Sequence, residues 1–128
     1  MPVELQLLVW SAILALAQML VAVAGAQSQV SLPVLAGNRD NMPQLTGWAL
    51  RATRAHLNML ESLVVFAILV LVAAATGRLN ETTALGANLF FWGRLAYAVV
   101  YVVGVPWLRT IVWGAAVVGL LVILSQVF

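Results

Sequence analysis

The chain has 128 residues, of which 64% are hydrophobic and 8% are charged. A soluble domain carries about a quarter charged residues, so this composition excludes a soluble enzyme, a nucleic-acid-binding module and a disordered tail. Six Arg, no Lys and four acidic residues give a net charge of +2, and without Cys there are no disulfides or thiolate metal sites. The sequence is that of a small integral membrane protein, with one domain over residues 1–128.

Four stretches are apolar enough to cross a bilayer, which requires about 20 residues. They are Leu5–Ala26, Trp48–Ala75, Thr83–Val103 and Trp107–Val127. No positive charge precedes the first stretch, so we expect it to remain as a span rather than be cleaved as a signal peptide. The one long loop, Gln27–Gly47, contains Pro33 and Pro43, which break helices. Because the other connections are short, neighbouring spans are antiparallel, and we predict an all-α, up-down four-helix bundle.

The placement of arginine predicts the orientation, because cytoplasmic loops carry an excess of Lys and Arg. One end of the predicted spans carries four arginines, Arg39, Arg51, Arg54 and Arg109. Only Arg78 lies at the opposite end. We therefore expect the Arg-rich end to be cytoplasmic and both termini to be outside. On the outer side, Asn80-Glu81-Thr82 matches a glycosylation sequon, which we interpret in so short a loop as a turn and helix cap.

Polar residues within two of the spans form narrow stripes. In the second span the stripe contains Arg51, Arg54, Asn58 and Glu61, which lie within about 80° on a helical wheel. In the third span it contains Arg94, Tyr97 and Tyr101. Such residues inside spans usually face the bundle interior or a wet cavity. Two facing stripes predict a polar pocket that opens toward the cytoplasm.

Two interpretations of this pocket remain open. In the structural one, Glu61 is paired with Arg54 or Arg94 and no ligand is involved. In the other, the excess of arginine over carboxylate binds an anion, because an unpaired buried cation is costly. Arg109 and Thr110 favour the second, since an Arg and free N–H groups at a helix start suit an anion and promote ionisation of a thiol. The alternative for Arg109 is that it only reaches toward the membrane surface.

Several other residues have ordinary structural interpretations. His56 lies on the opposite face of the second span, where we predict a helix contact rather than a metal ligand, because the chain has no Cys and no second His. Four tryptophans are predicted to be interfacial or lipid-facing: Trp48, Trp92, Trp107 and Trp113. The spacing of Ala115 and Gly119 is typical of close helix packing but identifies no specific contact.

Over nearly its whole length the sequence resembles the MAPEG family, the membrane-associated proteins in eicosanoid and glutathione metabolism. The most specific segment is Arg54-Ala55-His56-Leu57-Asn58-Met59-Leu60-Glu61, similar to the family's Arg-Ala-x-x-Asn-x-x-Glu. Arg94, Tyr97 and Tyr101 match the family's Arg-x-x-(Tyr/His)-x-x-x-Tyr, and Arg109-Thr110 resembles the Arg, often followed by Ser, that opens its fourth helix. All three motifs occur in the family's order.

The resemblance implies a homotrimer of four-helix subunits that binds glutathione, as a co-substrate, between neighbours near the cytoplasmic side. It implies that glutathione is held by Arg54, Asn58, Glu61, Arg94, Tyr97 and Tyr101, and that His56 faces the adjoining subunit. It further implies that Arg109, from a neighbouring chain, stabilises the thiolate, with Thr110 as a second donor. The thiolate would attack a lipophilic electrophile or reduce a lipid hydroperoxide.

Two other functions are weighed against this one. The first is a non-catalytic lipid-binding or scaffold protein of the same fold. The second is a small four-span exporter, which we disfavour because the only acid of the first span, Glu4, lies at its start rather than in its middle. The sequence does not identify the second substrate, since its apolar surface is generic Leu, Val and Ala.

Overall fold

The computed structural model describes residues 1–128 and contains helices but no strands. The helices are α1 (Val3–Gln29), α2 (Leu32–Ala36), α3 (Gly47–Ala75), α4 (Glu81–Val103) and α5 (Pro106–Val127). All except α2 are long and apolar enough to cross a membrane. The predicted all-α class and the four predicted spans are confirmed, and the chain is a multi-pass membrane protein.

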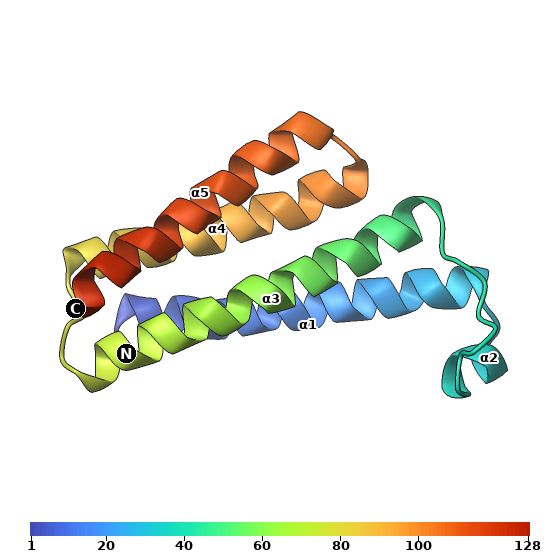
Figure 1. Cartoon of the computed structure of the whole chain (residues 1–128), viewed down its shortest axis with the longest axis horizontal. Coiled ribbons are helices and arrows are strands. Elements are labelled where there is room, and N and C mark those ends of the chain that lie inside the picture. Colours follow the sequence, from blue (N-terminus) through green and yellow to red (C-terminus); the bar gives the residue numbers. More distant parts are fainter.

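The short helix α2 is the one element that the sequence pattern did not predict. Pro33 lies in its first turn, where proline starts a helix well because the N–H that it lacks would have no partner there. The loop that contains α2 is closed by Gln29, whose side-chain amide donates to the Thr46 carbonyl at 2.8 Å and accepts from the Thr46 N–H at 2.9 Å. The end of α1 and the start of α3 therefore lie side by side, with α2 folded beside them (Figure 1).

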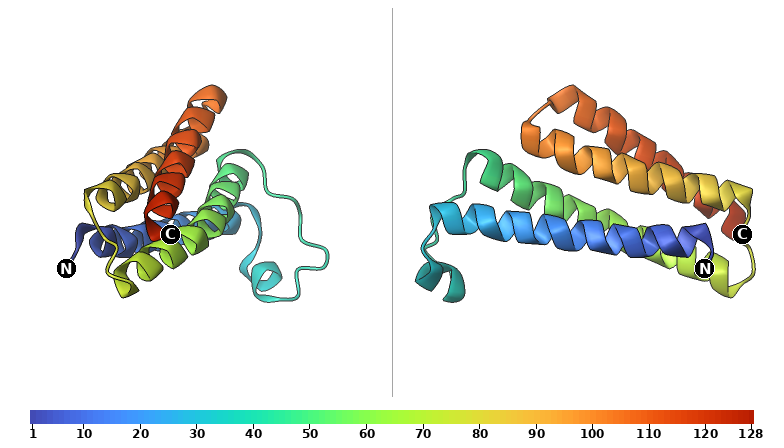
Figure 2. Two further views of the ribbon diagram at one scale, coloured as in Figure 1. Left: turned by 60° about the vertical axis from the view of Figure 1, so that its left-hand side comes forward. Right: turned by 180° about the vertical axis from the view of Figure 1, so that it is seen from behind.

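The four long helices form two antiparallel hairpins, α1 with α3 and α4 with α5 (Figure 1 and Figure 2). Both termini lie at the end of the bundle where α3 turns into α4, and the α2 loop and the α4–α5 turn lie at the other end (Figure 1). Arg39, Arg51, Arg54 and Arg109 belong to this second end. The two hairpins contact each other chiefly through α4, which packs against both α1 and α3.

Helices α4 and α5 touch at their backbones. A Cβ added to Gly86 would lie 2.7 Å from the carbonyl oxygen of Gly119, and a Cβ on Gly119 would lie 2.5 Å from that of Gly86. Gly93 similarly faces Ala116. Gly119 thus lies at a close helix contact that its spacing from Ala115 did not identify, and its partner glycine, Gly86, lies on α4. These contacts join the first half of α4 to the middle and second half of α5.

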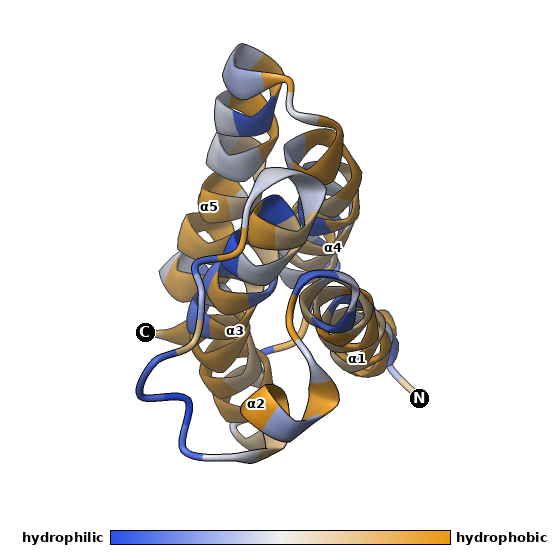
Figure 3. Cartoon of the chain, turned by 90° about the vertical axis from the view of Figure 1, so that its right-hand side faces the viewer, coloured by the Kyte–Doolittle hydropathy of each residue, from blue (hydrophilic) through white to orange (hydrophobic).

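A small apolar core joins α3 to the second hairpin. The rings of Phe66 and Phe90 stack with centroids 4.1 Å apart, and both side chains are fully buried with Met59 and Ile123. Only 27 of 128 residues are buried, and large apolar side chains cover the outside of the long helices. Figure 3 shows a hydrophilic loop beside α2 and long helices that are mostly hydrophobic, as expected for a bundle surrounded by lipid.

At the end that holds the termini, a buried polar contact ties α1 to α4. The Thr83 hydroxyl donates to the Glu4 carboxylate at 2.5 Å, and both side chains are buried. Asn80 caps α4: its side chain accepts from the Thr83 N–H, and the Thr83 side chain accepts from the Asn80 N–H. The predicted helix cap at Asn80 is confirmed.

Candidate functional site

Arg94 is the most deeply buried charged residue of the chain, with 1% of its surface exposed. Its Nη1 donates to Oδ1 of Asn58 on α3 at 2.8 Å, and its guanidinium carbon lies 4.2 Å from the centre of the Tyr97 ring. Its Nε and Nη2 have no hydrogen-bond partner. A buried cation that is bonded only to a neutral amide and an aromatic face carries unbalanced charge and two free donors.

Aromatic rings extend this arrangement along α4 to α5. The Tyr97 and Tyr101 rings have centroids 5.4 Å apart, and the Arg109 guanidinium carbon lies 4.8 Å from the centre of the Tyr101 ring. Arg94, Tyr97, Tyr101 and Arg109 thus form a continuous row in which each cation covers a ring. Cation–π contacts fix the direction of both guanidinium groups without neutralising them.

A polar cavity of about 180 Å³ lies beside this row, where α3, α4 and α5 meet. Its lining residues are Asn58, Tyr97, Arg109, Thr110 and Trp113. Residues of all three predicted motifs are therefore brought together within a single chain. Within this chain Arg109 lies beside Asn58 and Tyr97, and the implied approach of Arg109 from a neighbouring chain stays a prediction.

The internal ion pair of Glu61 that the structural interpretation requires does not occur. Arg94 bonds Asn58 instead, and Glu61 and Arg54 both lie exposed on α3. Neither residue lines the polar cavity. The purely structural interpretation of the stripe therefore lacks its central ion pair, while Arg54 and Glu61 remain free to contact a ligand or another subunit.

Arg51 has a contact that the helical wheel did not predict. Its Nε donates to the carbonyl of Val102 at 2.9 Å, in the last turn of α4. Gly104 follows with φ of 95°, a left-handed conformation that ends the helix. A cation at a helix C-terminus is favourable to the helix dipole, so the observed contact of Arg51 is structural and joins α3 to the end of α4.

His56 faces away from the polar cavity, as its position on the helical wheel predicts. It lines a larger cavity of about 470 Å³ between α1, α2 and α3, together with Arg39 and nine apolar residues. Its Nδ1 is buried without a hydrogen-bond partner. Arg39 is fixed at this cavity by a 2.7 Å hydrogen bond from its Nε to the Leu35 carbonyl.

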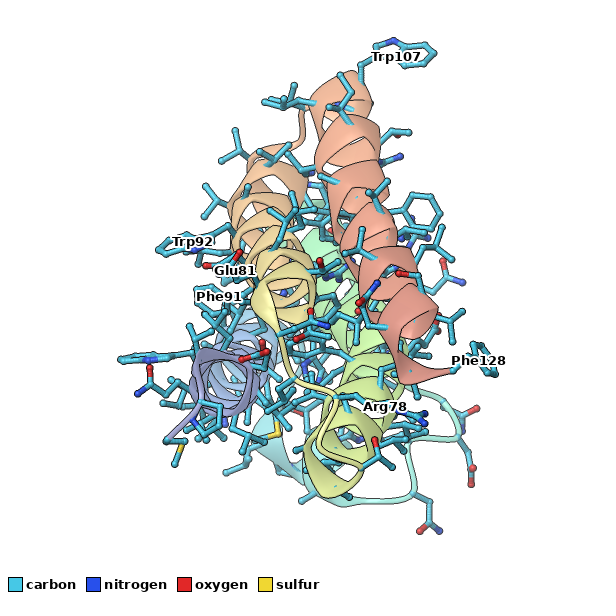
Figure 4. All side chains as sticks on the ribbon, turned by 90° about the vertical axis from the view of Figure 1, so that its left-hand side faces the viewer. Arg78, Glu81, Phe91, Trp92, Trp107 and Phe128 are labelled. Atoms are coloured by element: carbon cyan, nitrogen blue, oxygen red, sulfur yellow. The ribbon has the colours of Figure 1, made fainter.

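Trp113 is the one residue of the polar cavity that the sequence analysis missed. Trp92 and Trp107 project away from the bundle, as predicted for interfacial or lipid-facing tryptophans (Figure 4). Trp113 was given the same interpretation, although it follows Arg109 by four residues and so lies on the same helix face. That spacing was the signal that would have placed it in the site.

The comparisons with known proteins identify one family. The profile of the MAPEG family matches residues 7–128, which is nearly the whole chain and includes every residue of the polar cavity. No curated protein matches the chain.

Proposed function

The chain belongs to the MAPEG family, and from this membership and the geometry of the polar cavity we propose that it is a membrane-embedded glutathione-dependent transferase or peroxidase. The observation that supports this most directly is the unbalanced charge of Arg94. Its Nε and Nη2 have no partner and its only hydrogen-bonded neighbour is neutral. A small anion with carboxylate groups supplies the missing partners, and bonds between Arg and carboxylate are among the strongest hydrogen bonds in proteins.

In this proposal the side chains of α3 and α4 bind the peptide. Arg94 and Arg54 hold the carboxylates of glutathione, Glu61 holds its amino group, and Asn58 bonds its backbone. Tyr97 and Tyr101 form the wall behind the peptide. Holding the charged ends fixes the position of the sulfur, which raises its effective concentration toward a second substrate.

Arg109 and Thr110 act on the sulfur. The guanidinium group of Arg109 favours the thiolate over the thiol, because an adjacent cation lowers the pKa of a thiol. The Thr110 hydroxyl, whose only hydrogen bond is a long one of 3.4 Å to the Pro106 carbonyl, is available as a second donor. Groups that are already oriented toward the developing charge need no reorganisation during the reaction.

Two reactions follow from a glutathione thiolate beside the bilayer. With an electrophile, a carbon–sulfur bond forms as the leaving group departs. With a lipid hydroperoxide, the thiolate attacks the terminal oxygen and yields an alcohol and a glutathione sulfenic acid. A second glutathione condenses with the sulfenic acid to give a disulfide and water.

The proposal includes a homotrimer with the site toward the cytoplasm. Arg54 and Glu61 lie exposed, where a neighbouring subunit would enclose the peptide bound between them. His56 on the other face of α3 would then approach the site of the next subunit. The concentration of arginine at this end of the bundle supports a cytoplasmic position.

The alternative is a non-catalytic lipid-binding or scaffold member of the same fold. One observation favours it: the larger cavity, of about 470 Å³, is lined mostly by apolar residues and lies outside the polar site. Volumes of this size are typical of small-molecule sites. This alternative predicts binding of a lipid without turnover of glutathione.

Titration of the purified protein with glutathione separates the two functions. The absorbance of a thiolate should rise and saturate as the peptide binds, and product should form when an electrophile is added. The matched variant is Arg109→Ala, which should bind glutathione with a much smaller rise. If correctly assembled wild-type protein gives neither an absorbance rise nor a conjugate, the proposed enzymatic function is wrong.

A further inference from the structure

Trp113 lies beside the proposed position of the sulfur. It follows Arg109 by four residues on α5, which places it about 6 Å further along the helix and about 40° around it. Both side chains line the polar cavity with Asn58 and Tyr97. Because α5 starts at the Arg-rich end, Trp113 is the lining residue of α5 that lies nearer the middle of the span.

The indole of Trp113 is available for a ligand. The residue is 42% exposed although it lines the cavity. Trp107, on the same helix, is 82% exposed and points away from the bundle at the start of α5 (Figure 4). The two tryptophans therefore differ in what they face: Trp113 faces the cavity and Trp107 faces the surroundings.

Trp113 is the large apolar side chain of α5 that lines the polar cavity, so a second substrate that comes from the middle of the bilayer would meet its indole beside the proposed position of the sulfur. The side chains on the Arg109 side of the cavity are polar, whereas Trp113 offers a flat, electron-rich apolar surface. Aromatic rings prefer offset or edge contacts with such a surface, and an electron-poor ring complements the negative face of the indole. Tyr97 provides a second ring across the cavity.

We propose that Trp113 determines the specificity for the second substrate, and that the site prefers planar, electron-poor aromatic electrophiles to alkyl electrophiles. This inference rests on the proposed function. The reaction is a nucleophilic aromatic substitution: the thiolate sulfur forms a bond to the ring carbon that carries chlorine, the carbon–chlorine bond breaks, and chloride leaves. Trp113 holds the ring and takes no part in bond making.

The test compares two electrophiles across four forms of the full-length protein. The electrophiles are chlorodinitrobenzene, which is aromatic, and nonenal, which is an alkyl enal. The proteins are wild type, Trp113→Leu, Trp113→Phe and the control Trp107→Leu. We expect Trp113→Leu to lower kcat/KM for chlorodinitrobenzene by about five- to tenfold and for nonenal by less than about twofold, while Trp113→Phe and Trp107→Leu stay near wild type.

A measurement on wild type alone covers the case in which Trp113→Leu fails to assemble. Unreactive dinitrobenzene should inhibit conjugation of nonenal at concentrations at which nitrohexane does not. Equal inhibition by the two compounds would overturn the role of Trp113, as would an equal loss in Trp113→Leu of activity toward chlorodinitrobenzene and nonenal. Neither result would contradict the proposed enzymatic function. Wild-type protein that conjugates neither electrophile would refute the proposed function, and the inference with it.

Discussion

Nη1 of Arg94 donates a 2.8 Å hydrogen bond to Oδ1 of Asn58, and this bond joins α4 to α3 beside the polar cavity. The partner of the most buried cation is thus an amide, where a carboxylate of similar size would have neutralised it. Burying a charge without a counter-charge costs free energy, and a bound anion recovers part of that cost. The pairing is consistent with a site that binds an acid.

Replacing the neutral partner of Arg94 by a charged one tests whether its unbalanced charge binds the ligand. Asn58→Asp keeps the side-chain size and supplies Arg94 with an internal carboxylate. We expect affinity for glutathione to fall by at least about tenfold, because charge-assisted bonds contribute about 1.5–3 kcal/mol, while thermal stability is kept. Calorimetric titration and thermal unfolding measure the two effects. Unchanged affinity in a folded Asn58→Asp protein would contradict the role of the surplus charge.

Arg109 is expected to control the reactivity of the sulfur more than the binding of the peptide. Arg109→Ala should lower kcat/KM for conjugation by about a hundredfold, the loss typical for removal of one group that stabilises developing charge. Arg109→Lys, which keeps the charge but not the planar fork, should be intermediate. Stopped-flow absorbance of the thiolate and steady-state rates provide the readouts. A fall in glutathione affinity with unchanged rate would instead assign Arg109 to binding.

The backbone contact between α4 and α5 predicts a sharp difference between two glycines of α5. Gly119→Ala would place a methyl group 2.5 Å from the Gly86 carbonyl oxygen, so the helices must separate, at a cost of about 1–3 kcal/mol. Gly114→Ala adds its methyl group where no atom lies within 4 Å and should be neutral or slightly stabilising. Thermal unfolding in detergent measures both. Equal effects of the two substitutions would show that the contact does not form.

The absence of cysteine makes the membrane orientation directly measurable. Ser28 lies near the end of α1 at the Arg-rich end, Thr76 follows α3 at the opposite end, and both are exposed. We expect a membrane-impermeant thiol reagent applied from outside intact cells to label Thr76→Cys and not Ser28→Cys. Labelling of both after permeabilisation is the control. The reverse pattern would place the site on the outer side.

The sequence predicted the four spans because each satisfies the length and apolarity that a bilayer requires. It also predicted the Asn80 cap, because the two residues that form the cap, Asn80 and Thr83, are only three positions apart in the sequence. It did not predict α2, because Pro33 can either end or start a helix and the choice depends on the fold of the whole loop.

The site could be predicted only in part. Asn58, Arg94 and Tyr97 were identified from the stripes on their own helices and Arg109 from its place at a helix start, and the structure brings these residues close together. A wheel cannot show which residue a side chain meets on another helix, so it placed Arg51 in the stripe although it bonds the end of α4. It also left Trp113 among the lipid-facing tryptophans, because only the packing of α5 on α4 brings that indole to the cavity.

The contact between Gly86 and Gly119 has a mechanical consequence. Two helices whose backbones touch cannot slide or roll past each other without losing that contact, so α4 and α5 move as one rigid body that carries Arg94, Tyr97, Tyr101 and Arg109 together. Asn58 is the one lining residue of the polar cavity that lies outside this body, so a tilt of α3 against it would change the width of the cavity.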